Sequence, residues 1–139
     1  MTIRRFEDIG ARQDARELAK SVYQTTGRGG FARDFGLRDQ IQRAAGSVMH
    51  NIAEGYDSGS DSEFVRFLRY AQRSCTEVES ELYVALDQKY ITDRQFQVLF
   101  EQTKKVRAKI GGFIKYLLSS KASGRRTRDE ATRDKEPKD

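Results

Sequence analysis

Residues 92–118, TDRQFQVLFEQTKKVRAKIGGFIKYLL, carry the most regular apolar pattern in the chain. One stripe advances by alternating steps of three and four residues, through Phe96, Leu99, Thr103, Val106, Ile110, Phe113 and Leu117. This heptad spacing predicts a helix that packs lengthwise against other helices. Gly111 and Gly112 interrupt the stripe without shifting its phase. We therefore expect one helix with a weak point, since each glycine costs about 1 kcal/mol relative to alanine.

The sequence also marks where this helix and the one before it begin. Thr92 followed by Gln95, and Ser60 followed by Glu63, form capping boxes, in which side chains satisfy two amide donors at a helix start. Only two or three residues, at 89–91, separate the helical segment that begins at Ser60 from Thr92. A link that short makes the two helices antiparallel neighbours.

Two further segments with a helical period lie at about residues 8–26 and 37–54. Four amphipathic helices with short links predict an all-α fold, an antiparallel up-down-up-down four-helix bundle over residues 1–118. Residues 119–139 contain no large apolar side chain and carry seven basic and five acidic residues. Such a segment cannot offset its ordering entropy, so we expect a disordered charged tail.

The composition excludes several classes of protein. The 139 residues include one Cys and one His, which excludes an intrachain disulfide and a Cys-rich zinc module. A di-iron bundle needs Glu-x-x-His, but Ser47 stands three residues before His50. No apolar run approaches the roughly 18–20 residues of a membrane span, and the N-terminus has no apolar signal core. We expect a soluble, cytoplasmic protein without a metal or cofactor.

Charge is divided along the third helical segment, which begins at Ser60 and ends before residue 89. Its first half carries Arg66, Arg69 and Arg73, and its second half carries Glu77, Glu79 and Glu81. Three interpretations stay open: a contact in which a neighbouring subunit pairs opposite halves, a plain solvated face, and an anion site. No nucleophile or histidine accompanies the carboxylates in a catalytic pattern, so we predict no catalytic residues. Cys75 lies on the apolar stripe and is predicted to be a small buried side chain.

Basic residues give the chain a formal net charge of +5 and gather in its last helix and tail. The last helix contributes Lys104, Lys105, Arg107 and Lys109, and the tail contributes Arg125 and Arg126. Clustered Lys and Arg attract phosphate backbones regardless of base sequence. With the three arginines of the third segment, they predict charge-led binding of RNA or DNA. The sequence has no helix-turn-helix spacing, zinc finger or aromatic RNA platform.

Residues 40–55, QIQRAAGSVMHNIAEG, resemble the signature of a bacterial family of four-helix-bundle proteins. That family was first noticed as open reading frames in intervening sequences of large-subunit ribosomal RNA genes. The resemblance continues through Ser74, Glu77 and Glu81 and covers about residues 3–118. It implies a homopentamer of bundles around a central channel. The chain also resembles the accessory protein of diversity-generating retroelements, a basic pentamer that binds nucleic acid and reverse transcriptase.

Polar residues of this signature are predicted to have a structural or interface role. Asn51 and Glu54 lie three residues apart on one helix face, where they could bond to backbone groups or to Arg43 and fix the helix register. Ser74, Glu77 and Glu81 belong to the same predicted set. A functional pocket at these residues is the alternative.

These patterns predict a non-catalytic homo-oligomeric module that binds nucleic acid through its basic surfaces. The alternative is a protein-interaction scaffold, in which the same surfaces dock an acidic partner and nucleic acid has no role. Salt dependence separates the two, because phosphate contacts weaken steeply with salt.

Overall fold

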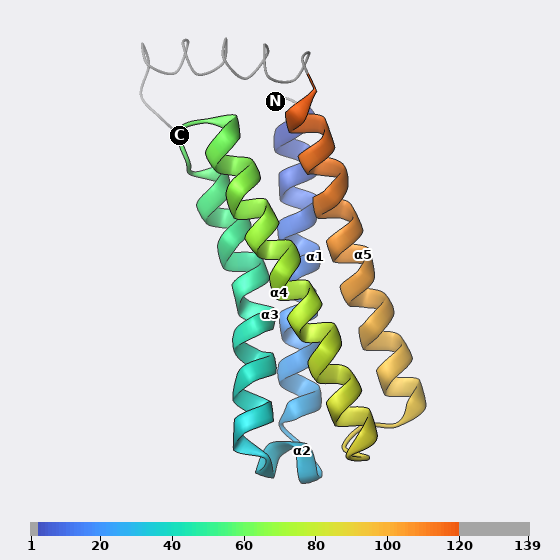
Figure 1. The fold of residues 1–139 in the computed structure, drawn as a ribbon. Helices are drawn as coiled ribbons and strands as arrows, with labels where there is room; N and C mark the ends of the chain where they lie inside the picture. Colours follow the sequence, from blue (N-terminus) through green and yellow to red (C-terminus); the bar gives the residue numbers. More distant parts are fainter. Residues whose placement is uncertain (1–2, 120–139) are drawn as a thin grey trace.

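The computed structural model describes the backbone of residues 3–119 and the side chains of residues 10–119. This part of the chain is entirely helical (Figure 1) and contains no strand. Its elements are α1 (Ile3–Thr26), α2 (Gly29–Arg33), α3 (Phe35–Tyr56), α4 (Asp61–Asp87) and α5 (Asp93–Leu118). The all-α prediction is confirmed for these residues. Apart from Ser119, the predicted tail lies outside them.

The four long helices lie side by side along their lengths (Figure 1). Their main contacts run from α1 to α3, from α3 to α4, from α4 to α5, and from α5 back to α1. The helix α2 and the link from α4 to α5 lie at one end, and the link from α3 to α4 lies at the other (Figure 1). Helix α4 therefore lies between α3 and α5, diagonally across the bundle from α1.

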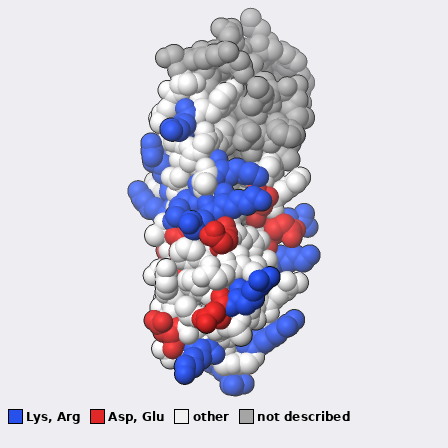
Figure 2. All heavy atoms as spheres, turned by 90° about the vertical axis from the view of Figure 1, so that its right-hand side faces the viewer, with Lys and Arg blue, Asp and Glu red and all other residues white. Residues whose placement is uncertain are grey.

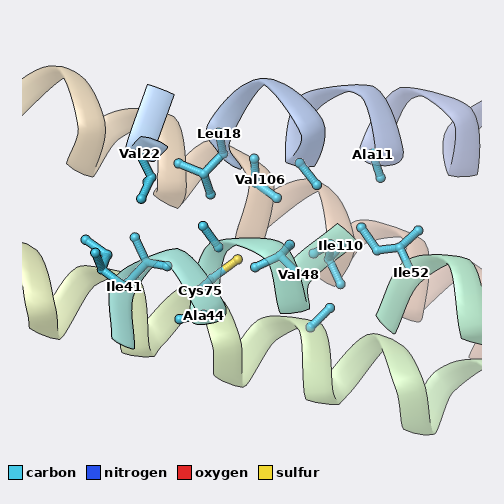
Figure 3. Packing of buried hydrophobic residues seen from close by; sticks show 14 of the residues in the cluster. Ala11, Leu18, Val22, Ile41, Ala44, Val48, Ile52, Cys75, Val106 and Ile110 are labelled. Carbon is cyan, nitrogen blue, oxygen red and sulfur yellow. The ribbon is translucent and has the colours of Figure 1, made fainter. Parts of the chain in front are cut away.

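The predicted apolar stripes form a shared core. Figure 3 shows side chains of α1 and α3 pointing toward one another, among them Leu18 and Val48, which are both fully buried. Cys75 lies within this core, as predicted, and burial raises the pKa of its thiol to about 12. The helix α5 runs unbroken through Gly111, where an added Cβ would lie 3.1 Å from Nε2 of Gln72 on α4. Only the end of the Gln72 side chain comes near this glycine.

Two helix starts were predicted from capping boxes. The structure contains the complete box at α5 and half of the box at α4. At α5, the Thr92 hydroxyl accepts from the N–H of Gln95 at 3.0 Å and the Gln95 side chain accepts from the N–H of Thr92 at 2.8 Å, so this box is confirmed. At α4, the hydroxyl of Ser60 accepts from the N–H of Glu63 at 3.2 Å. The Glu63 carboxylate instead binds Arg66 one turn further on, so only half of the second box forms.

The short helix α2 was not predicted, and α1 begins at Ile3 rather than near residue 8. Gly29 adopts a positive φ of 56°, which favours glycine, and α2 places Phe31 in the core. The Phe31 ring lies 5.6 Å from the ring of Tyr90. The Tyr90 hydroxyl donates to Asp34, whose other carboxylate oxygen accepts from the N–H of Leu37 and caps α3. This end of the bundle is thus closed by aromatic packing and one shared carboxylate.

Candidate functional site

A polar cavity of about 170 Å³ lies between α3 and α4. Helix α3 contributes residues spaced three or four apart, which places them on one side of the helix. The lining residues are Gln40, Arg43, Ala44 and Ser47 from α3, and Glu77 and Glu81 from α4. The structure therefore brings Arg43, Glu77 and Glu81 together, three of the residues predicted to have a structural or interface role.

A hydrogen-bond network beside this cavity joins the two helices. The Asn51 side-chain amide donates to the backbone carbonyl and to the hydroxyl of Ser47, both at 2.9 Å. The Ser74 hydroxyl on α4 lies 3.0 Å from that of Ser47 and 3.2 Å from the carbonyl of Tyr70. Asn51 thus bonds to its own helix, and the Ser47–Ser74 hydrogen bond links α3 to α4. Glu54 is exposed, so only Asn51 of the predicted pair lies in this network.

Glu81 has an unusual electrostatic environment for a side chain that is only half-buried. Burial raises the pKa of its carboxyl to about 7, Glu77 adds to the rise, and Arg43 opposes it. Its Oε1 atom is buried and has no hydrogen-bond partner among the described residues. The cavity can therefore hold a proton on Glu81 near neutral pH, or accept a cationic donor that pairs with it.

The three predicted arginines of α4 have different surroundings. Arg66 forms an ion pair with Glu63 at 2.7 Å and donates to the Tyr70 hydroxyl at 3.0 Å, and both contacts raise its pKa. The Arg73 guanidinium lies 5.3 Å from the centre of the Tyr70 ring. Arg69 and Arg73 are exposed. Arg66 is thus partly neutralised on its own helix.

Two of the predicted basic residues of α5 are held by other helices. Arg107 forms an ion pair with Glu79 of α4, whose side chain is 10% exposed, and Lys109 forms an ion pair with Asp14 of α1. Sequence reasoning missed both pairings because they join helices far apart in the chain. The one indication in the sequence was the position of Glu79, an acidic residue beside the apolar stripe of α4. These two cations hold the bundle together and are poorly placed to meet a phosphate.

The other two basic residues of α5 face solvent. Lys104 is exposed and lies 3.8 Å from Glu101 on its own helix, a pair that contributes little to stability. Lys105 is exposed as well. Figure 2 shows the face of the molecule over α5, where Lys and Arg are interspersed with Asp and Glu. Arg125 and Arg126 lie outside the described residues.

A second hollow, of about 280 Å³, lies between α1 and α3; its lining is basic and consists of Arg12, Gln13, Arg16 and Met49. The Arg12 guanidinium also lies 5.7 Å from the centre of the Tyr56 ring. Within residues 10–119, no three His, Cys, Asp or Glu side chains are grouped so that they could hold a metal ion. No helix of the described chain is both long and apolar enough to cross a membrane.

The fold and these surfaces define a small helical-bundle protein with a polar cavity between α3 and α4. The sequence pattern of the 23S rRNA-intervening sequence protein family matches residues 7–112, and the chain belongs to that family. The predicted family resemblance is thereby confirmed. No curated protein matches the chain.

A solved structure supports the same fold. It is the 1.70 Å crystal structure of a protein of unknown function from the S23 ribosomal protein family of Bacteroides thetaiotaomicron. The two share 23% sequence identity with a TM-score of 0.73, over 78% of this chain and 98% of the other. At this identity the similarity concerns the fold alone.

Proposed function

We propose that this protein is a non-catalytic, homo-oligomeric module that binds nucleic acid through charge-led contacts. The observation that carries the proposal is the exposure of Arg69 and Arg73 on α4 and of Lys104 and Lys105 on α5. Clustered exposed cations attract phosphate backbones.

The ion pairs narrow the proposed binding set. Arg107 and Lys109 are excluded because each is held by a carboxylate of another helix. Arg66 contributes less than its neighbours because Glu63 already pairs with it. Arg69, Arg73, Lys104 and Lys105 remain as the main phosphate contacts among the described residues, with Arg125 and Arg126 as additional contacts from the tail.

A non-catalytic role is supported by the chemistry of the α3–α4 cavity. An enzyme needs a nucleophile, a base and a group that stabilises developing charge in one place. The nearby hydroxyls of Ser47 and Ser74 bond to one another and to backbone or amide groups, and serve the register of the helices. The cavity is therefore better suited to binding a cationic side chain than to catalysis.

The assembly that we propose is a homopentamer of up-down-up-down bundles, as the family resemblance implies. Exposed aromatic and apolar side chains support contacts between copies, since such residues are enriched at interfaces. Tyr83 is 52% exposed, with its ring tilted against Phe96 and edge-on to Phe100, and Val98 is 52% exposed. Light scattering coupled to size-exclusion chromatography measures the number of copies directly. A monomer would contradict this part of the proposal.

Binding is tested by titrating single-stranded RNA and double-stranded DNA of mixed sequence over a range of salt concentrations. We expect affinity to fall steeply with salt, and the double variant R69Q/R73Q to have a shallower slope by about two phosphate contacts. The matched control, R16Q/K20Q, removes the same charge from α1, across the bundle from α4, and should keep the slope. No binding of either nucleic acid at low salt would overturn the proposal.

The alternative function is a scaffold that docks an acidic protein. The exposed Tyr83, with Phe96 and Phe100 beneath it, favours this candidate, because aromatic side chains anchor protein interfaces. The two functions respond differently to Tyr83→Ala. Protein docking should weaken, whereas the salt slope of nucleic-acid binding should stay unchanged.

A further inference from the structure

Two adjoining hollows lie at the α2 end of the bundle, along the seam between α1 and α5. The first has a volume of about 300 Å³ and the second a volume of about 250 Å³. Both are lined by Gln24, Thr25 and Gln95, so they form one continuous surface, which we call the α1–α5 groove. Since α1 and α5 pack against each other, as α3 and α4 do, this groove lies on the opposite side of the bundle from the α3–α4 cavity.

Two arginines flank the groove. Arg28 lies in the link from α1 to α2, where its backbone is extended and the positive φ of Gly29 turns the chain after it, and Arg94 lies in the first turn of α5. Arg28 lines the first hollow and Arg94 lines the second. Both are exposed, and neither forms an ion pair within residues 10–119. Figure 2 shows Lys and Arg side chains at this end of the molecule, away from the grey residues.

The lining of the groove also contains polar groups with unused hydrogen-bonding capacity. Among the described residues, no Asp or Glu lines either hollow. The side chains of Gln24 and Thr25 make no hydrogen bond to the described part of the chain. Gln95 accepts from the N–H of Thr92 with its side-chain oxygen, which leaves its amide donors. Because an amide both donates and accepts, such side chains can pair with the edge of a nucleic-acid base.

Tyr90 adds an aromatic ring to the first hollow. Its hydroxyl donates to Asp34 at 3.0 Å, and its ring packs against that of Phe31, with ring centres 5.6 Å apart. These two contacts hold the ring in place, yet Tyr90 remains partly exposed. Proteins that bind single-stranded nucleic acid stack unpaired bases on such rings and hold the backbone with nearby cations.

We propose that the α1–α5 groove binds one nucleotide of a single-stranded nucleic acid. The base lies beside Tyr90 and Gln24. The phosphates on its two sides meet Arg28 and Arg94. A hollow of about 300 Å³ lies at the lower end of the range of roughly 300–1,000 Å³ found for ligand pockets. An unpaired base can enter such a hollow, whereas the bases of a duplex are stacked inside it.

The composition of the groove favours a nucleotide over an acidic peptide. A peptide carboxylate would use the arginines but would leave the ring of Tyr90 and the amide of Gln24 without a role. The ligand class rests on the proposed nucleic-acid function, to which the groove adds a preference for unpaired strands. Val98, which supports contacts between copies, lines only the second hollow, so a copy covering Val98 would leave the first hollow open.

The test uses the full-length protein and a fluorescein-labelled RNA tetranucleotide of mixed sequence, with binding followed by fluorescence anisotropy. R28Q/R94Q should lower the affinity about tenfold at low salt and reduce the salt slope by about 1.4, because each phosphate contact of a single strand contributes about 0.7. The matched control R16Q/K115Q removes the same charge from two exposed positions outside the groove. It should keep the affinity and the slope.

A second variant separates recognition of the base from attraction to charge. Gln24→Ala removes an amide but no charge, so it should lower the affinity for the tetranucleotide about two- to tenfold and leave the salt slope unchanged. Binding of double-stranded DNA should be the same for Gln24→Ala as for the wild type. Circular dichroism establishes that each variant is folded.

Three outcomes would overturn the groove. They are equal affinity of R28Q/R94Q and its control for the tetranucleotide, full affinity of Gln24→Ala, and a glutamate tetrapeptide that binds as tightly as the RNA. Failure of the groove is distinguishable from failure of the proposed function. A salt slope that changes in R69Q/R73Q but not in R28Q/R94Q leaves the proposed function standing without the groove, and the reverse result leaves the groove standing alone. No binding of RNA or DNA to the wild type at low salt removes both.

Discussion

Gly55 provides the sharpest test of how α3 and α4 pack. A Cβ added at this position would lie 2.8 Å from Cδ1 of Phe64 and 3.1 Å from Cβ of Phe67. Phe64 is fully buried and packs edge-to-face on Phe113, with ring centres 5.1 Å apart. The Phe64 ring therefore has little room to move away, and Gly55→Ala forces α3 and α4 apart.

The magnitude follows from two opposing effects. Inserting a methyl group into a well-packed core costs about 1–3 kcal/mol, whereas replacing a helical glycine by alanine gains up to about 1 kcal/mol. The gain is smaller here because Gly55 is next to the last residue of α3. We expect Gly55→Ala to lower the free energy of unfolding by about 1–2 kcal/mol.

Gly46 is the matched control on the same helix. An added Cβ there meets nothing within 4 Å, so Gly46→Ala should raise the free energy of unfolding by about 0.5–1 kcal/mol. Urea denaturation followed by circular dichroism measures both variants, at one protein concentration because association of copies also stabilises the fold. If Gly55→Ala unfolds at the same urea concentration as Gly46→Ala, the close approach of α3 and α4 is refuted.

Three further predictions concern charged and titratable groups. Arg107→Ala should lower the free energy of unfolding by about 3 kcal/mol, because it leaves the Glu79 carboxylate buried without its partner. Lys104→Ala, which removes an exposed ion pair, should change the free energy of unfolding by less than about 1 kcal/mol. Urea denaturation measures both variants. With a folded-state pKa of about 7 against an ordinary 4.5, Glu81 binds a proton in the folded protein that the unfolded chain releases between those values. Stability should therefore fall as pH rises from 5 to 7, and Glu81→Gln should flatten this dependence; an unchanged slope would show that Glu81 is not the group responsible. Cys75, buried with a thiol pKa raised to about 12, should react with a thiol reagent only after unfolding, and rapid labelling of the folded protein would contradict its place in the core.

The parts of the fold that were predictable depend on local repetition. The stripe through Leu99 and Ile110 needed only the helical period, and the start at Thr92 needed only side chains three residues apart. Both features are set within a few turns of one helix. The confirmed all-α class followed from four such stripes.

The parts that were missed depend on partners that the apolar period and the capping pattern do not include. The helix α2 was not predicted, and it is supported by the contact of buried Phe31 with Tyr90. Glu63 was predicted to complete a capping box, but Arg66 competes for its carboxylate. In each case a partner outside the local pattern decides the conformation.

The same limit explains why composition overstated the basic surface. A count of Lys and Arg on α5 cannot show that Arg107 and Lys109 are already neutralised by α4 and α1. On α4 the positive charges of Arg69 and Arg73 are followed by Glu77, one turn or about 6 Å beyond Arg73. That separation is shorter than the screening length of about 8 Å at physiological salt, so Glu77 repels any phosphate bound at Arg73. A polyanion lying along α4 would therefore be attracted at Arg69 and Arg73 and repelled at Glu77 and beyond.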